Sequence, residues 1–288
     1  MAIARAAVLC GFGINCEYET AHALRLAGAK TELVHFNSLQ NSPQELQTYQ
    51  LLALPGGFSF GDDIQSGRVL ANKFKFKIFS HLKKFVDEGK PVIGICNGFQ
   101  ALVQLGALPG WGGWEERNLT LMANRNGKFE DRWVRLRTES CVCPFAQGMD
   151  SVFSLPIRHG EGQVALADIH TLEKLSDNRQ VVFRYAGNDG MKATSYPDNP
   201  NGSADAIAGL CNQYGNVLGM MPHPECHVRY LQNPLWTANP PQIGEKKEKG
   251  ALSGILKKIG VQGGGKSCED YGNCIPFFEG VVNAAKKY

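Results

Sequence analysis

Apolar and polar residues follow a repeated strand–helix pattern over the first hundred residues of the chain. Short continuous apolar runs alternate with segments in which apolar residues recur at helical spacing. Strands of a parallel sheet are buried on both faces and give such runs. We therefore predict an α/β fold whose mostly parallel sheet is covered by helices on both faces. The predicted strands are Ala6–Cys10, Thr31–Phe36, Leu51–Leu54 and Val92–Ile95, and the predicted helices are Glu17–Leu26, a short one opening with a capping box at Ser42, Lys73–Glu88 and Gly98–Leu105.

The pattern changes after Gly106, where apolar strands follow one another without long helices between them. Asp205–Asn212 and Asn216–Met221 lie on either side of Gly215, so they predict an antiparallel hairpin. We expect such strands to form antiparallel additions to the parallel core. Further strands are predicted at Leu119–Ala123, Trp133–Thr138 and Val181–Tyr185.

The end of the chain predicts an insertion followed by a closing helix. Residues 237–274 are rich in proline, glycine and charged residues, which is typical of an exposed segment. Residues 275–287 carry apolar side chains at helical spacing. A chain of 288 residues, 43% of them hydrophobic, can bury a full core. We predict a single domain over residues 1–288.

Composition excludes several classes of protein. No apolar run approaches the roughly 20 residues of a membrane span, and a net charge of +3 with scattered Lys and Arg gives no case for nucleic acid. Nine cysteines without disulfide-framework spacing favour a reducing compartment. Neither Cys141-Val-Cys143 nor the pair Cys268 and Cys274 has the spacing of a zinc site. We expect a cytoplasmic protein that binds no metal, membrane or nucleic acid.

Cys96 lies in the sequence Gly94-Ile-Cys96-Asn-Gly98, directly after an apolar strand. This pattern predicts a sharp turn from strand to helix with the cysteine at its apex. The two glycines are needed because strand and helix approach too closely there for a Cβ atom. The positive potential at the start of the helix favours the thiolate. Cys96 is therefore a candidate nucleophile, although a buried structural cysteine is the alternative.

A second candidate group lies in Met221-Pro-His223-Pro-Glu225. Pro224 favours an extended backbone at His223, and residues two apart in an extended chain project to the same side. A carboxylate beside an imidazole can hold one tautomer and stabilise the imidazolium. Either segment alone could be structural, but together they predict a nucleophile, a base and an orienting carboxylate.

These motifs resemble those of the class I, or triad, glutamine amidotransferases, which implies their flavodoxin-like fold. A narrower set is similar to the glutaminase subunits of phosphoribosylformylglycinamidine synthase, and the match covers residues 1 to about 236 and the last residues from 275. The class is indicated by Pro55-Gly-Gly57, Gly94-Ile-Cys96-Asn-Gly98-Phe-Gln100 and His223-Pro-Glu225, and the narrower family by Asn15-Cys16-Glu17, Gly57-Phe-Ser-Phe-Gly61-Asp62 and Pro156-Ile-Arg-His159-Gly-Glu161-Gly162.

The resemblance implies hydrolysis of L-glutamine to glutamate and ammonia through a thioester on Cys96, with His223 as acid and base and Glu225 holding His223. An oxyanion hole is expected from the backbone N–H groups of Gly57 and Asn97. Substrate contacts are implied at Gln100, Phe58, His159, Gly160, Glu161 and Gly162.

The resemblance also implies a partner that uses the ammonia. In this family an ATP-dependent synthetase subunit makes formylglycinamidine ribonucleotide for purine biosynthesis, often with a small third subunit. ATP and magnesium are expected only on the synthetase, so this chain is expected to need no cofactor.

Three alternatives keep the fold but change the function: a glutaminase subunit of another amidotransferase pathway, a cysteine-dependent hydrolase that is not a glutaminase, and a regulatory protein without catalysis.

Overall fold

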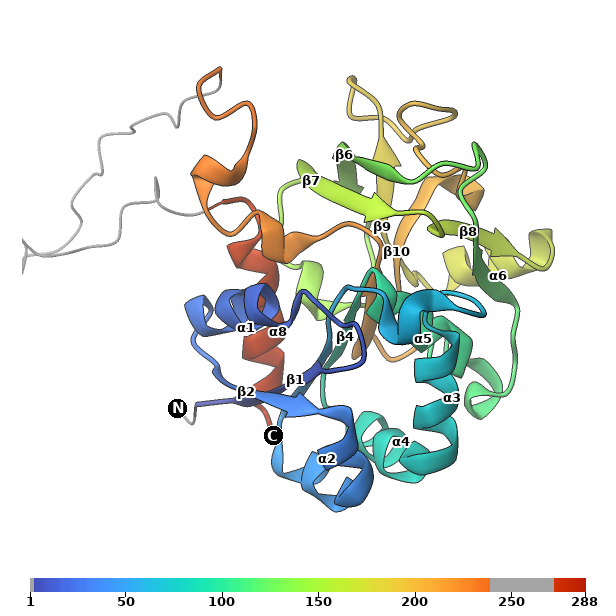
Figure 1. Ribbon diagram of the computed structural model, residues 1–288. Coiled ribbons are helices and arrows are strands. Elements are labelled where there is room, and N and C mark those ends of the chain that lie inside the picture. Colours follow the sequence, from blue (N-terminus) through green and yellow to red (C-terminus); the bar gives the residue numbers. More distant parts are fainter. Residues whose placement is uncertain (1–2, 239–271) are drawn as a thin grey trace, which may run out of the picture.

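The computed structural model describes residues 3–238 and 272–288, which are built around one mixed sheet of nine strands (Figure 1). The strand order is β2-β1-β3-β4-β11-β10-β9-β6-β7, and β5 pairs with β8 in a separate ribbon. The strands are β1 (Arg5–Cys10), β2 (Lys30–His35), β3 (Leu51–Leu54), β4 (Val92–Ile95), β5 (Leu119–Met122), β6 (Glu130–Thr138), β7 (Val152–His159), β8 (Gln163–Leu166), β9 (Val181–Ala186), β10 (Ile207–Cys211) and β11 (Val217–Met220).

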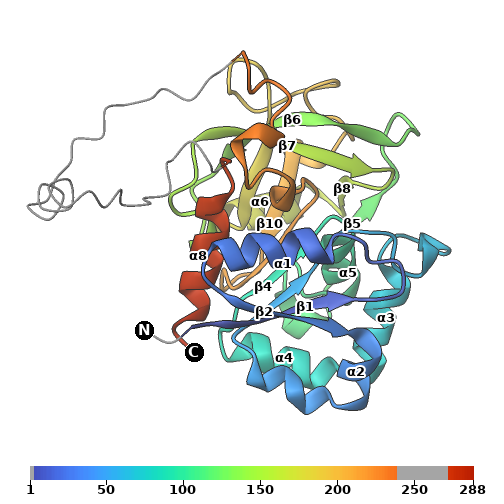
Figure 2. The ribbon, with the colours of Figure 1, turned by 60° about the vertical axis from the view of Figure 1, so that its left-hand side comes forward.

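Helices cover both faces of the parallel half of the sheet (Figures 1 and 2). One face packs against α1 and α8, and the other packs against α2, α3, α4 and α5. Successive residues of β1 point to opposite faces, so Ala6 and Val8 join one core cluster while Ala7 and Leu9 join the other. The helices are α1 (Glu17–Leu26), α2 (Phe36–Asn41), α3 (Arg68–Lys77), α4 (Phe79–Asp87), α5 (Asn97–Leu105), α6 (Ile169–Asp177) and α8 (Ile275–Ala285).

The predicted mostly parallel sheet with antiparallel additions is confirmed. Strands β2, β1, β3, β4 and β11 are parallel to their neighbours in this half. The predicted hairpin is β10 and β11, which pair antiparallel. Because β11 then lies parallel to β4, the hairpin delivers the chain after Met220 to the edge of the sheet where Cys96 begins its turn.

The short helix predicted to open at Ser42 is present as a 3-10 helix, Pro43–Thr48, although the Ser42 side chain makes no capping bond. A further helix, α2, precedes it and starts at Phe36, where the His35 ring accepts from the Asn37 N–H. One predicted helix is wrong in its boundaries. The single helix predicted over Lys73–Glu88 is two helices, because Ile78 leaves the helical conformation and is buried in the core.

Helix α6 was not predicted, since the second half was expected to lack such a helix. Its start has an ordinary signal, because the Asp168 carboxylate accepts from the Thr171 N–H at 2.8 Å.

The closing helix predicted over 275–287 is confirmed as α8. Most of the predicted insertion at 237–274 lies outside the described residues. No helix within the described residues is both long and apolar enough to cross a membrane.

Helix α8 is expected to stabilise the sheet rather than merely end the chain. The Phe278 side chain is fully buried in the same core cluster as strand β1. Replacement by alanine leaves a cavity, so Phe278→Ala should lower the free energy of unfolding by about 3–5 kcal/mol in urea denaturation. Glu279→Ala, at an exposed position of the same helix, should stay within about 0.5 kcal/mol of the wild type. Equal losses for both variants would contradict this role.

Candidate active site

Cys96 occupies the apex of the turn between β4 and α5. Its backbone has φ 49° and ψ −105°, a sparsely populated positive-φ conformation that costs a non-glycine residue roughly 1–3 kcal/mol. The two glycines of the motif are needed for the predicted reason. A Cβ on Gly98 would lie 1.9 Å from the Leu54 carbonyl oxygen, and one on Gly94 would lie 2.5 Å from Leu102 Cδ1. The turn therefore holds the thiol at the carboxyl edge of the sheet.

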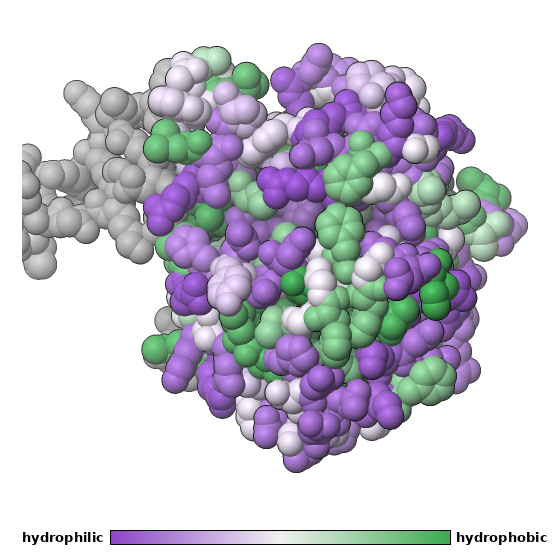
Figure 3. Space-filling model, in the orientation of Figure 1, coloured by the Kyte–Doolittle hydropathy of each residue, from purple (hydrophilic) through white to green (hydrophobic). Residues whose placement is uncertain are grey.

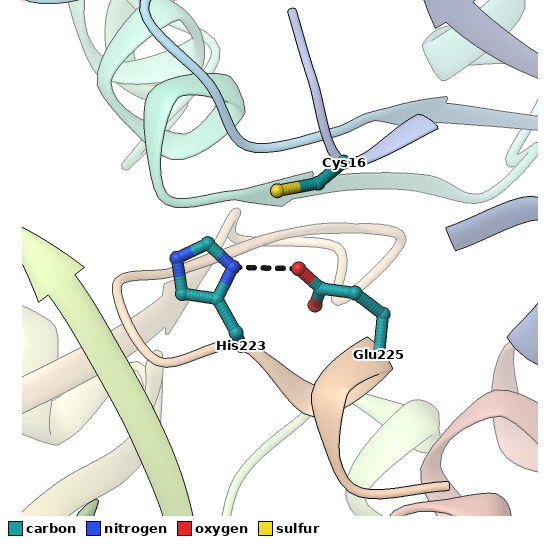
Figure 4. A group of neighbouring side chains, drawn as sticks. All are labelled: Cys16, His223 and Glu225. Atoms are coloured by element: carbon teal, nitrogen blue, oxygen red, sulfur yellow. Dashed lines mark hydrogen bonds and ion pairs between the residues drawn. The ribbon is translucent and has the colours of Figure 1, made fainter. Parts of the chain in front are cut away.

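His223 and Glu225 follow the neighbouring strand, β11. The Cys96 N–H donates to the Met220 carbonyl at 2.8 Å, and the His223 N–H donates to the Pro156 carbonyl at 2.9 Å. The His223 Nδ1 and Glu225 Oε1 atoms are 2.6 Å apart in a buried pair (Figure 4). The His223 and Glu225 side chains therefore project to the same side, as predicted.

The structure brings the Cys96 and His223 side chains together over the Pro55-Gly-Gly57 turn after β3. A Cβ on Gly56 would lie 2.8 Å from His223 Cε1, and 3.4 Å from both Cys96 Cβ and Cys16 Sγ. Cys96 retains 5% of its surface exposed, and its Sγ lies 3.7 Å from the Arg158 carbonyl oxygen.

The charge state of His223 follows from its neighbours. Burial on its own would lower the pKa of His223, but the Glu225 carboxylate, and then the Cys96 and Cys16 sulfurs, raise that pKa well above 6.5. The imidazolium form is therefore favoured next to the thiol. An imidazolium stabilises a neighbouring thiolate, which is the reactive form of cysteine.

The two residues predicted for an oxyanion hole each follow a residue close to the nucleophile: Asn97 follows Cys96, and Gly57 follows Gly56, where an added Cβ would lie 3.4 Å from Cys96 Cβ. Asn97 is the first residue of α5, where backbone N–H groups have no acceptor within the helix. Gly57 has a φ of 147°, and a Cβ there would lie 2.6 Å from the Gly13 carbonyl oxygen. Both N–H groups belong to turns at the same edge of the sheet.

Gln100 and Asn97 belong to a buried hydrogen-bond network. The Asn97 amide donates to Gln100 Oε1 at 3.0 Å and to Asp62 Oδ1 at 3.1 Å. The Gln100 amide donates to the Glu161 carbonyl at 2.5 Å. The Glu161 carboxylate in turn accepts from the Ser66 N–H at 3.2 Å. The network joins α5 to the two loops that contain the other predicted substrate contacts.

His159 is the last residue of β7, and Gly160 and Gly162 belong to the tight loop that leads to β8. His159 is buried, and that burial, followed by the charge of His223, lowers its pKa to about 3. A Cβ on Gly162 would lie 2.4 Å from the His159 ring. The neutral His159 ring bonds to Asn124 Oδ1 at 3.1 Å and leaves its Nε2 without a partner among the described residues.

Phe58 is the one predicted contact residue that lies largely on the surface, with 46% of its area exposed. Its ring centroid is 6.3 Å from that of Phe129. Apolar residues gather across the middle of the face seen in Figure 3.

Sequence reasoning missed two residues of the site. Asn124 organises the loop after β7, because its side chain bonds the His159 ring, the His159 carbonyl and the Gly162 N–H. Nothing in the sequence distinguishes this asparagine from others in loops. Cys16 was noted only in a family motif, yet its sulfur belongs to a close group with His223 and Glu225, the one group of potential metal ligands found within the described residues (Figure 4).

Comparisons with known proteins agree with this geometry. Residues 3–252 match the family described as the CobB/CobQ-like glutamine amidotransferase domain. A Methanococcus maripaludis protein called phosphoribosylformylglycinamidine synthase subunit PurQ is 42% identical over 252 residues, which cover 86% of this chain and 89% of that protein. A Dehalococcoides mccartyi protein of the same name is 43% identical over 227 residues, covering 78% and 86%.

Among solved structures, a chain in PurLQS from Thermotoga maritima has a TM-score of 0.63 and 33% identity, covering 81% of this chain and 92% of that chain. Similarity over most of both chains favours the narrower resemblance over the three alternatives raised by the sequence. The chain belongs to the CobB/CobQ-like glutamine amidotransferases, and within them to the family of PurQ subunits.

Proposed function

We propose that this chain is the glutaminase subunit of a phosphoribosylformylglycinamidine synthase and supplies ammonia for purine biosynthesis. The observation that carries the proposal is the meeting of Cys96 with the buried His223–Glu225 pair at the ends of two adjacent parallel strands. The two PurQ relatives, which are 42% and 43% identical to this chain, support the assignment of the glutaminase to this synthase.

The chemistry is acyl transfer from nitrogen to sulfur and then to water. The Cys96 thiolate attacks the carboxamide carbon of L-glutamine, and the oxygen becomes an oxyanion facing the N–H groups of Gly57 and Asn97. As the C–N bond breaks, the His223 imidazolium gives its proton to the departing ammonia. Water then attacks the thioester while neutral His223 accepts its proton, which releases glutamate and restores the thiolate–imidazolium pair.

Glu225 is assigned the role of holding His223. Its Oε1 accepts from Nδ1, so the ring presents Nε2 for proton transfer. The Nε2 atom is buried and has no hydrogen-bond partner within the described residues, which supports its availability to a substrate.

Glutamine recognition is assigned to the loops around the thiol. Gln100 and Glu161 are fixed by the buried network, and the loop of His159, Gly160 and Gly162 is fixed by Asn124. A rigid arrangement of this kind can hold the amino and carboxylate groups of an amino acid while the side-chain amide meets Cys96. Phe58 lies at the outer side of this arrangement.

A separate synthetase subunit consumes the ammonia in this proposal. The complex also contains a small third subunit. The neighbouring structure of PurLQS supports an assembly of this type. ATP and magnesium belong to the synthetase in this proposal, and the present chain supplies only the amidotransferase chemistry. A cytoplasmic location stays a prediction.

The nucleophile can be tested by substitution and by labelling. Cys96→Ala should lower glutamine hydrolysis by at least about 10⁴-fold, because the thioester forms on the Cys96 sulfur in this mechanism. A glutamine-like electrophile such as diazo-oxo-norleucine should label the wild type once per chain and Cys96→Ala not at all, as measured by mass spectrometry. Cys141→Ala, which removes a distant thiol, is the matched control and should keep both activity and labelling. Labelling of another cysteine in Cys96→Ala would refute the assignment.

The pH dependence of glutamine hydrolysis should depend on the negative charge of Glu225. Glu225→Gln removes the main influence that raises the pKa of His223, so the imidazolium should lose its proton at lower pH. The alkaline limb of the kcat/KM profile should move to lower pH, and the rate should fall by up to about 10⁴-fold. Glu173→Gln, on an exposed helix position, should leave the profile unchanged. An unshifted alkaline limb in Glu225→Gln would contradict the role of this carboxylate.

Docking of the synthetase should activate the glutaminase. Ammonia is mostly protonated at neutral pH, so release before docking would waste the product. Ammonia formation should rise about tenfold or more when the cognate synthetase and its nucleotide are added, which corresponds to about 1.4 kcal/mol of barrier. Full activity of the isolated chain would disprove this coupling without affecting the assignment of the nucleophile.

A further inference from the structure

Cys16 places a second sulfur at the catalytic pair. Its Sγ, one His223 ring nitrogen and one Glu225 carboxylate oxygen all lie within 4.8 Å of one another. Figure 4 shows the three side chains directed toward a common point, with Cys16 coming from the start of α1 and the other two from the segment after β11. The mechanism of glutamine hydrolysis gives this sulfur no task.

The surrounding structure fixes Cys16 in this place. The Asn15 and Cys16 N–H groups both donate to the Gly56 carbonyl at 3.2 Å, which ties the start of α1 to the turn after β3. The Cys16 thiol donates to Asn15 Oδ1 at 3.3 Å. The residue as a whole is half-buried.

The donor set is the one that zinc prefers. Thiolate sulfur, imidazole nitrogen and carboxylate oxygen bind Zn²⁺ at about 2.0–2.3 Å, so ligand atoms around one ion lie roughly 3–4 Å apart. The ligand atoms of the present group lie within 4.8 Å of one another, so they need to approach by at most about 1–2 Å to meet that condition.

An independent observation points to a ligand at this position. Glu225 Oε2 is buried, and no hydrogen-bond partner for it is found within the described residues. Buried carboxylate oxygens are normally satisfied. Because Oε1 already bonds to His223, Oε2 can bind an ion without first giving up another bond.

We infer that Cys16, His223 and Glu225 form an inhibitory site for a thiophilic divalent cation, with Zn²⁺ as the test ion. Binding transfers the thiol proton of Cys16 and the Nδ1 proton of His223 to solvent, and no electron transfer takes place. With the ion on Nδ1 in place of the proton, the hydrogen bond from Nδ1 to Glu225 Oε1 is lost. The neutral, metal-bound ring keeps its Nε2 proton and cannot alternate between acid and base. Glutamine hydrolysis stops until a chelator removes the ion.

This site differs from the zinc sites that paired cysteines form. The expectation of no metal rested on paired cysteine spacings, whereas about two hundred residues separate Cys16 from His223 and Glu225 in the chain. The ion is an inhibitor in this inference and not a resident cofactor. The inhibitory consequence rests on the proposed function, but the binding of the ion does not.

Binding can be measured on the full reduced chain without substrate, by competition with a chromophoric zinc chelator. The wild type should bind one ion that Cys16→Ala binds at least about tenfold more weakly, since even outer-shell changes cost 10- to 100-fold. Cys16→Ser keeps the side-chain volume and should behave like Cys16→Ala. Cys226→Ala removes a half-buried thiol next to Glu225 and is the matched control, with affinity unchanged.

The Cys96→Ala variant separates this site from simple capture of metal by the nucleophile. It should keep the tight zinc site, because Cys96 is not one of the ligands. Equal zinc affinity in the wild type and both Cys16 variants would overturn the inference, and so would loss of binding in Cys96→Ala alone.

Inhibition is tested on the complex with the synthetase. Zinc held at a fixed free concentration should stop glutamate formation, and a chelator should restore it. The rate of each protein is expressed as a fraction of its own zinc-free rate. The zinc concentration that gives half inhibition should then be at least about tenfold higher for Cys16→Ser than for the wild type. Tight binding without inhibition would overturn the inhibitory role. A complex that hydrolyses no glutamine before zinc is added would instead refute the proposed function.

Discussion

The pairing of β4 with β11 is the constraint on which the site depends. The register sets Gly94 opposite Gly219 and Ile95 opposite Met220, so the chains leading to Cys96 and His223 leave the sheet side by side. Well over a hundred residues separate the two side chains along the chain, and no local preference could bring them together. A slip of one residue would turn every side chain of β11 to the opposite face of the sheet. The hairpin with β10 holds that register from the other side.

The two buried histidines of the site show how the fold sets charge. His223 and His159 are both almost fully buried, and burial disfavours the charged form of each. A carboxylate bonds to His223 and reverses the effect, whereas His159 is bonded to an uncharged amide and stays neutral. The positive charge is thereby confined to one ring, the one beside the thiol. The same fold thus provides a titrating imidazole and a purely polar one a short distance apart.

Much of this architecture could be predicted because its signals are local. The strands β3 and β4, helix α1 and the turn at Cys96 follow from apolar runs and from glycines whose missing Cβ atoms the structure explains. The site residues could be grouped because parallel strands end at a common edge. The error in the helix predicted over Lys73–Glu88 has a tertiary cause, because Ile78 leaves the helical conformation and buries its side chain in the core. Asn124 and Cys16 could not be assigned because only folding gives them their partners.

The turn after β3 sets a limit on how this protein can vary. Gly56 lies against the imidazole, the nucleophile and the second sulfur, and a methyl group there would touch both cysteines and press on the His223 ring. Some glycines are required for their backbone torsion angles. Gly56 is instead required because the neighbouring side chains leave no space for a Cβ atom. Tolerance to mutation should therefore be low at a residue that donates no side chain to the reaction.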